Sequence, residues 1–122
     1  MRLTQLFEAG ALTMAVAAGA ACSNSTYGSS SSCTPTATQV CLVSSTFNPV
    51  TLMITHGATV TWVNADGITH TVTSDPTSTE VFDHSFSGGT FSHTFNTAGT
   101  YNYHCTIHGG VGTGMHGTIT VN

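Results

Sequence analysis

The amino-acid sequence predicts an all-β fold, a β-sandwich of seven to eight short strands. From Val40 onward, segments rich in Val, Ile, Thr and aromatic residues alternate apolar with polar side chains, which is the period of half-buried strands. Gly, Asn, Asp and Pro interrupt these segments at regular spacing, and turns spaced in this way are typical of sandwiches. This region contains no stretch with the period of an amphipathic helix.

The first four strands are predicted before a long irregular connection. Trp62, the only tryptophan, lies in the third of them, and the dipeptide Asp66-Gly67 marks the turn before the fourth. In that fourth strand His70 and Val72 share one face, while the threonines between and after them share the other. These strands are expected at residues 40–44, 47–55, 59–64 and 70–73.

Three more strands are predicted after the connection, which covers residues 74–89 and contains Pro76 and two glycines as breakers. In the second of them Tyr101, Tyr103 and Cys105 have the same parity, so the thiol points into the core if the tyrosines do. These strands are expected at residues 90–96, 100–105 and 117–121.

The N-terminal part of the chain predicts export. Residues 1–21 resemble a signal peptide, because Arg2 is followed by an apolar run that is too short to span a bilayer. This run ends at Cys22 in a pattern similar to a bacterial lipobox, so either Cys22 is lipidated or cleavage occurs at the small residues before it. Residues 22–39 are rich in Ser and Thr and are expected to form a tether, which leaves residues 40–122 as the folded domain.

The cysteines allow two pairings. In an oxidising compartment Cys33 can pair with Cys41 across a short loop, with Cys22 free for lipid and Cys105 free for metal. In the alternative pairing, Cys22 bonds to Cys33 or Cys41 and one thiol is left over. The sequence alone does not choose between these connectivities.

Charge excludes two classes of partner. Arg2 is the only basic side chain in the 122 residues, and it lies in the predicted signal peptide. The mature chain would then contain four acidic side chains and no Lys or Arg. Binding to nucleic acid, or to acidic lipids by charge, is therefore not expected.

A second pattern predicts a metal site. Cys105, His108 and Met115 place a thiolate, an imidazole and a thioether on one strand-to-strand connection. Two histidines, one cysteine and a weak axial methionine form the ligand set of blue copper, and His70 is the best candidate for the second histidine. Each of these residues alone has an ordinary structural explanation, such as a buried Cys or a core Met. It is their joint occurrence that indicates copper.

Two segments of the chain, FNPVTLMITHGATVTWVNADGITHTVTSD and FSHTFNTAGTYNYHCTIHGGVGTGMHGTITV, resemble cupredoxins of the plastocyanin, amicyanin and pseudoazurin type. The resemblance implies an eight-stranded Greek-key sandwich with one type 1 copper held by His70, Cys105, His108 and Met115. It also implies one-electron transfer rather than enzymatic catalysis, by a monomer that docks its redox partners near His108.

The chain departs from this family pattern at three places. Ile107 stands where the family often has Pro, and six residues, 109–114, precede Met115 where the family has two to four, so a longer and softer loop is expected. His116, next to Met115, could compete as the axial ligand. Thr71 replaces the Asn of plastocyanins, so we expect a hydrogen bond around the site to be altered.

Two other functions remain open at this stage. His104, beside Cys105, resembles the histidine that ligates a type 2 copper in copper nitrite reductases, which would make the chain part of an enzyme. Alternatively, the further histidines would serve a periplasmic copper carrier or storage protein, although they show no ligand repeat. These are His56, His84, His93 and His116.

Overall fold

The computed structural model describes residues 32–122, and all regular secondary structure in this part of the chain is β-strand. In this range there is accordingly no helix of the length and apolarity needed to cross a membrane. The predicted signal peptide and most of the predicted tether lie outside the described residues. The strands are β1 (Gln39–Val43), β2 (Thr46–Asn48), β3 (Thr51–Ile54), β4 (Thr59–Asn64), β5 (His70–Ser74), β6 (Asp83–Phe86), β7 (Gly89–Thr94), β8 (Gly99–Gly110) and β9 (Thr113–Val121).

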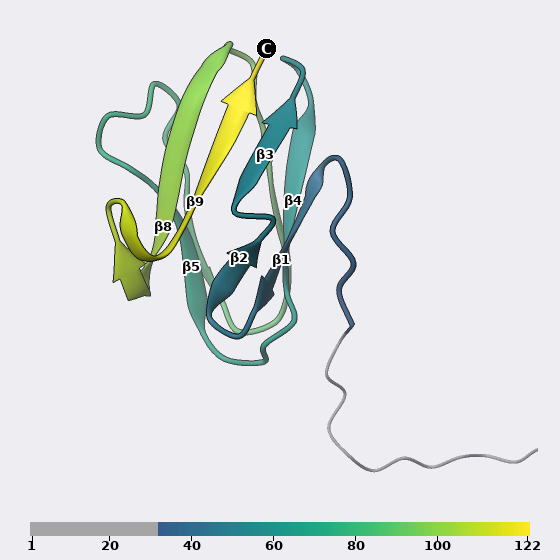
Figure 1. Ribbon diagram of the computed structural model, residues 1–122, viewed down its shortest axis with the longest axis vertical. Helices are drawn as coiled ribbons and strands as arrows, with labels where there is room; N and C mark the ends of the chain where they lie inside the picture. Colours follow the sequence, from purple (N-terminus) through teal and green to yellow (C-terminus); the bar gives the residue numbers. More distant parts are fainter. Residues whose placement is uncertain (1–31) are drawn as a thin grey trace, which may run out of the picture.

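These strands form two mixed sheets, which confirms the predicted all-β class. One sheet has the order β2-β1-β4-β7 and the other β3-β9-β8-β5-β6. β1 runs parallel to β4, and β3 runs parallel to β9, whereas the remaining pairs are antiparallel. Figure 1 shows β8, β9 and β3 side by side, with the C-terminus at the end of β9.

Three strand predictions were wrong in detail. The predicted strand at 47–55 is divided into β2 and β3, which belong to different sheets. The predicted irregular connection contains β6, which pairs with β5 although Phe86 is its only buried residue, so it has no apolar pattern to reveal it. Finally, residues 109–114 do not form a soft loop. β8 extends to Gly110 and β9 begins at Thr113, so most of these residues belong to a β-hairpin.

Aromatic side chains fill the core. Trp62 is fully buried, with ring centroids 5.5 Å from Tyr103 and 5.6 Å from Phe91. Burying a large apolar side chain contributes up to about 3 kcal/mol, so this cluster anchors β4 to β8. Tyr101, Tyr103 and Cys105 are each at most 1% exposed. The predicted common face of β8 is therefore confirmed, and the thiol of Cys105 points inward.

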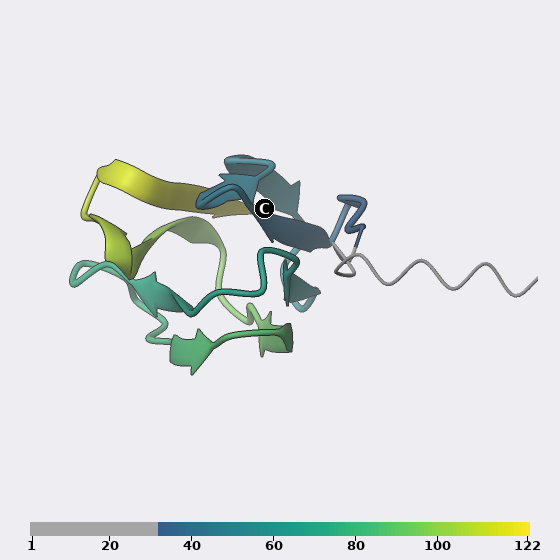
Figure 2. The ribbon, with the colours of Figure 1, turned by 90° about the horizontal axis from the view of Figure 1, so that it is seen from below.

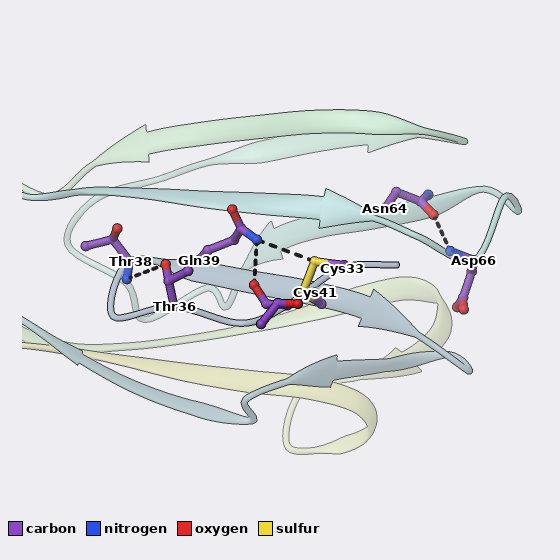
Figure 3. The surroundings of a disulfide bond; sticks show 8 residues. Cys33, Thr36, Thr38, Gln39, Cys41, Asn64 and Asp66 are labelled. Carbon is purple, nitrogen blue, oxygen red and sulfur yellow. Dashed lines mark hydrogen bonds between the residues drawn. A yellow bond between two sulfur atoms is a disulfide. The ribbon is translucent and has the colours of Figure 1, made fainter. Parts of the chain in front are cut away.

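A disulfide joins Cys33 to Cys41 on β1 (Figure 3). This confirms the first of the two predicted pairings. Cys105 is the free cysteine of the described residues, and it is buried. A thiol that is kept out of the disulfide remains available as a metal ligand.

Histidines take the place of Lys and Arg as partners of the acidic side chains. The described residues contain no Lys or Arg, and three of the four carboxylates contact an imidazole nitrogen instead. The distances are 2.9 Å for Asp66 and His70, 2.6 Å for Asp75 and His104, and 3.0 Å for Glu80 and His93. Three of the four carboxylates of the described residues are therefore hydrogen-bonded to a histidine within the fold.

Candidate metal centre

A break in the pairing of β8 with β9 brings the predicted ligands together. The two strands pair His104 with His116, and then resume at Gly109 with Gly114. Between these two pairs lie residues 105–108 on β8, but only Met115 on β9. The excess residues of β8 bulge out of the ladder, as extra residues in a strand must. This bulge brings both Cys105 and His108 next to His70, the first residue of β5. Figure 2 shows the β8–β9 hairpin at one side of the molecule, in yellow-green and yellow.

His70, Cys105 and His108 converge on one point. Cys105 Sγ lies 3.8 Å from His70 Nδ1 and 3.6 Å from His108 Nδ1, and the two imidazole nitrogens are 3.0 Å apart. In residues 32–122 this is the one trio of His, Cys, Asp or Glu side chains whose ligand atoms all lie within 4.8 Å of one another. The structure thus brings together three of the four predicted ligands through atoms that can bind a metal.

The donor set fits copper. Two imidazoles and a thiolate form the trigonal arrangement of blue-copper sites. His70 and Cys105 are fully buried, whereas His108 is partly exposed. The centre therefore lies at the edge of the core, with one imidazole facing solvent.

Met115 and its rival His116 occupy opposite faces of β9. Met115 is 2% exposed and alternates with Gly117, Ile119 and Val121 on the buried face. It lies directly opposite the bulge that contains Cys105. His116 is half-buried on the other face, where its Nδ1 donates a hydrogen bond to the carbonyl oxygen of Gly114 at 2.9 Å.

Thr71 joins β5 to the bulge by hydrogen bonds of both its backbone and its side chain. Its backbone N–H donates to Cys105 Sγ at 3.3 Å, and its hydroxyl oxygen accepts from the backbone N–H of Thr106 at 2.8 Å. We expected the replacement of Asn by Thr to alter the surroundings of the site. The structure shows that the Thr71 side chain reaches the residue after Cys105, so it ties β5 to the bulge.

Asp66 contacts the trio through His70, and the sequence analysis did not single it out for such a contact. Its carboxylate accepts a hydrogen bond from His70 Nε2 at 2.9 Å, and further bonds from the backbone N–H groups of Ser44 and Ser45. Burial by itself would raise the pKa of Asp66, but these donors outweigh it and hold the pKa below its usual value. In the sequence, Asp66 stands four positions before His70, but an Asp before Gly67 is equally expected as part of a turn. The sequence therefore gives no reason to assign Asp66 to the site.

The remaining histidines lie apart from this trio. His104 faces the opposite side of β8 from Cys105, as predicted, and its Nδ1 donates to Asp75 Oδ1 at 2.6 Å. His93 contacts Glu80, and the exposed His84 stacks on Phe91 with ring centroids 4.7 Å apart. These contacts give His104, His93 and His84 a structural role that needs no metal, and His56 is exposed.

Comparison with known proteins agrees with the site. Residues 35–122 match the model of a family described as copper binding proteins, plastocyanin/azurin family. A plastocyanin from Scenedesmus fuscus is 40% identical over 85 residues, which are 62% of this chain and 85% of that protein.

Two solved structures show the same fold. An amicyanin mutant in its oxidised state has a TM-score of 0.57 and 29% identity, covering 69% of this chain and 80% of that one. A copper-containing nitrite reductase from Thermus scotoductus has a TM-score of 0.62 and 28% identity, covering 74% of this chain but only 23% of that chain. With its family match spanning the whole sandwich, this chain belongs to the plastocyanin/azurin family of copper binding proteins.

Proposed function

We propose that this protein transfers single electrons through one copper ion held by His70, Cys105 and His108, with Met115 as a weak axial ligand. The observation that carries the proposal is the convergence of two imidazole nitrogens and one thiol within 4.8 Å. Copper bound to such a set cycles between Cu(II) and Cu(I). Met115 is favoured over His116 because it faces the buried side of β9, opposite the bulge.

The chain supports rapid transfer by keeping its ligands in place. His70 begins β5, whereas Cys105 and His108 belong to the β8 bulge, and Thr71 ties these two elements together. Ligands that are positioned before the metal binds need little rearrangement when its charge changes. The N–H of Thr71 donates to the sulfur, and hydrogen bonds of this kind tune the reduction potential.

The enzymatic hypothesis, with a second copper at His104, is less well supported. Plastocyanin is matched over 85% of its length, whereas the nitrite reductase is matched over 23% of its chain. Moreover, the contact between His104 Nδ1 and Asp75 already explains that histidine. We therefore assign the chain as an electron carrier, and neither as an enzyme nor as a copper store.

The partly exposed His108 is the proposed electron port. Exposed apolar side chains lie within three residues of the ligand histidines in the sequence: Ile107 is 54% exposed, Val111 60% and Ile68 47%. Because the described residues contain no Lys or Arg, we propose that redox proteins dock on this apolar surface by a contact that does not depend on charge. The chain itself is proposed to act as a monomer.

Electron exchange with an uncharged or apolar-surfaced redox partner is therefore expected to change less than about twofold between 10 mM and 500 mM salt, because screening acts on exposed charges. Stopped-flow measurement of the bimolecular rate constant tests this. A decrease of tenfold or more with salt would contradict the proposed mode of docking, since steered association falls steeply with ionic strength.

We further propose that the protein works outside the cytoplasm, after removal of residues 1–21, and that Cys22 either carries a lipid or becomes part of a free tether. The disulfide between Cys33 and Cys41 supports an oxidising compartment. Mass spectrometry of the protein purified from its natural host would distinguish a lipidated from an unmodified N-terminus.

The proposed function is tested by adding Cu(II) to the protein and recording its optical and EPR spectra. One copper per chain is expected, with an intense thiolate-to-copper band and a narrow hyperfine splitting. Met115→Leu should keep this colour and raise the reduction potential, because a weak axial donor to Cu(II) is lost. Loss of all copper in Met115→Leu would show that Met115 is not a weak ligand, and unchanged potential would move the axial role to another residue.

A further inference from the structure

Two carboxylates in this fold hold a histidine in the same way. Asp66 accepts from two adjacent backbone N–H groups and from His70 Nε2, and Glu80 accepts from two adjacent N–H groups and from His93 Nε2. In both cases these donors outweigh burial and hold the pKa of the carboxyl below its usual value. Only Asp66 contacts a member of the metal-binding trio.

The contact with Asp66 determines which nitrogen of His70 can bind metal. An ionised carboxylate only accepts hydrogen bonds, so Nε2 must carry the proton that it donates. In the neutral ring the other nitrogen, Nδ1, then has a free lone pair. This is the nitrogen that faces Cys105 Sγ at 3.8 Å and His108 Nδ1 at 3.0 Å.

Asp66 is itself held in place by the turn between β1 and β2. Ser44 and Ser45 both adopt the left-handed conformation, with φ of 51° and 53°, and their N–H groups donate to different oxygens of the carboxylate. Figure 3 shows Asp66 just beyond the end of β4, next to the end of β1. The side chain of Asp66 is 12% exposed, so its charge is only partly screened by water.

We propose that Asp66 is a positioning residue that fixes the metal-binding tautomer of His70 and favours Cu(II) over Cu(I), which lowers the reduction potential. This inference rests on the proposed copper site. The physical reason is that a carboxylate bonded to a ligand imidazole makes the imidazole a stronger donor. In addition, the negative charge interacts more favourably with the more highly charged oxidation state.

Asn cannot take over this arrangement. Its side chain offers one accepting oxygen, and its amide group is a donor. If that oxygen takes the place of Oδ2, it accepts from His70 and from the N–H of Ser45, but the amide then faces the N–H of Ser44, and two donors oppose each other. Asp66→Asn therefore loses either the contact with Ser44 or the contacts with Ser45 and His70, as well as the charge.

Glu80→Gln is the matched control, because it removes the same kind of carboxylate from a histidine that is not near the metal site. Both variants should lose thermal stability to a similar degree. Only Asp66→Asn should lower the preference for Cu(II) over Cu(I), by about tenfold, which for a one-electron couple is an increase of about 59 mV in potential. Redox titration of the optical band measures this shift.

The tautomer is tested separately in the metal-free wild-type protein, by NMR of the histidine ring nitrogens. A protonated Nε2 and an unprotonated Nδ1 are expected for His70. This measurement uses the wild-type protein without copper, so it does not depend on whether a variant folds. An Nδ1–H tautomer would overturn the inference, as would an equal change of potential in both variants or no change in either. If wild-type protein binds no copper in a blue site, the proposed function fails instead, whatever the NMR result.

Discussion

Cys105→Ser is expected to abolish the intense visible band of the copper protein completely. That absorption arises from charge transfer between thiolate sulfur and Cu(II). Cys105 supplies the sulfur, which accepts a hydrogen bond from the N–H of Thr71 and lies next to the imidazoles of His70 and His108. A serine hydroxyl is not deprotonated at neutral pH and is a poor ligand for this soft site. Optical titration with Cu(II), with EPR to count any copper that still binds, measures the effect.

His104→Gln provides the control for this substitution. His104 is the neighbour of Cys105 in sequence, but its side chain lies on the opposite face of β8, where it contacts Asp75. This variant should lose some stability and retain the blue band at one copper per chain. A blue band that persists in Cys105→Ser, or disappears in His104→Gln, would contradict the assigned ligand set.

The fold class and the metal trio could be predicted because both depend on local patterns. Strand alternation carries its information within a few residues, so the inward direction of Cys105 follows from its parity with Tyr101 and Tyr103. Because Cys105 and His108 are only three residues apart, both side chains likewise belong to one short segment of chain. For His70, the sequence supplied a candidate, and the sheet order that puts β5 beside β8 explains why it meets the other two.

The parts that were missed depend on contacts between distant segments. Nothing in the sequence around Asp66 shows that the turn at Ser44 and Ser45 lies next to it, because that proximity comes from the parallel pairing of β1 with β4. β6 was missed for a similar reason: its partner β5 defines it, and its own pattern of burial is too weak. Thr71 was identified as a departure, but only the structure shows that its hydroxyl reaches Thr106.

The glycines after His108 were interpreted as a source of softness, whereas the structure shows that at least one of them is required for close packing. At Gly109 an added Cβ would lie 2.5 Å from the backbone nitrogen of Met115, 2.7 Å from its carbonyl oxygen and 2.8 Å from the carbonyl oxygen of Thr113. All three atoms belong to the backbone of β9. They cannot move aside without opening the hairpin that carries His108 and Met115.

Gly109→Ala is therefore expected to reduce copper affinity by at least tenfold and to lower the stability of the copper-loaded protein by about 3 kcal/mol, the upper range for overpacking. Gly110→Ala is the matched control in the same hairpin, because its Cβ would meet only the Thr113 methyl group at 3.7 Å. Competition with a Cu(I) chelator and thermal denaturation of both variants measure the two effects. If the variants behave alike, the hairpin yields at Gly109, and the rigid support that we assign to the ligands between β8 and β9 is wrong. If only Gly109→Ala loses copper, the close contact between the two strands is what keeps His108 and Met115 at the site.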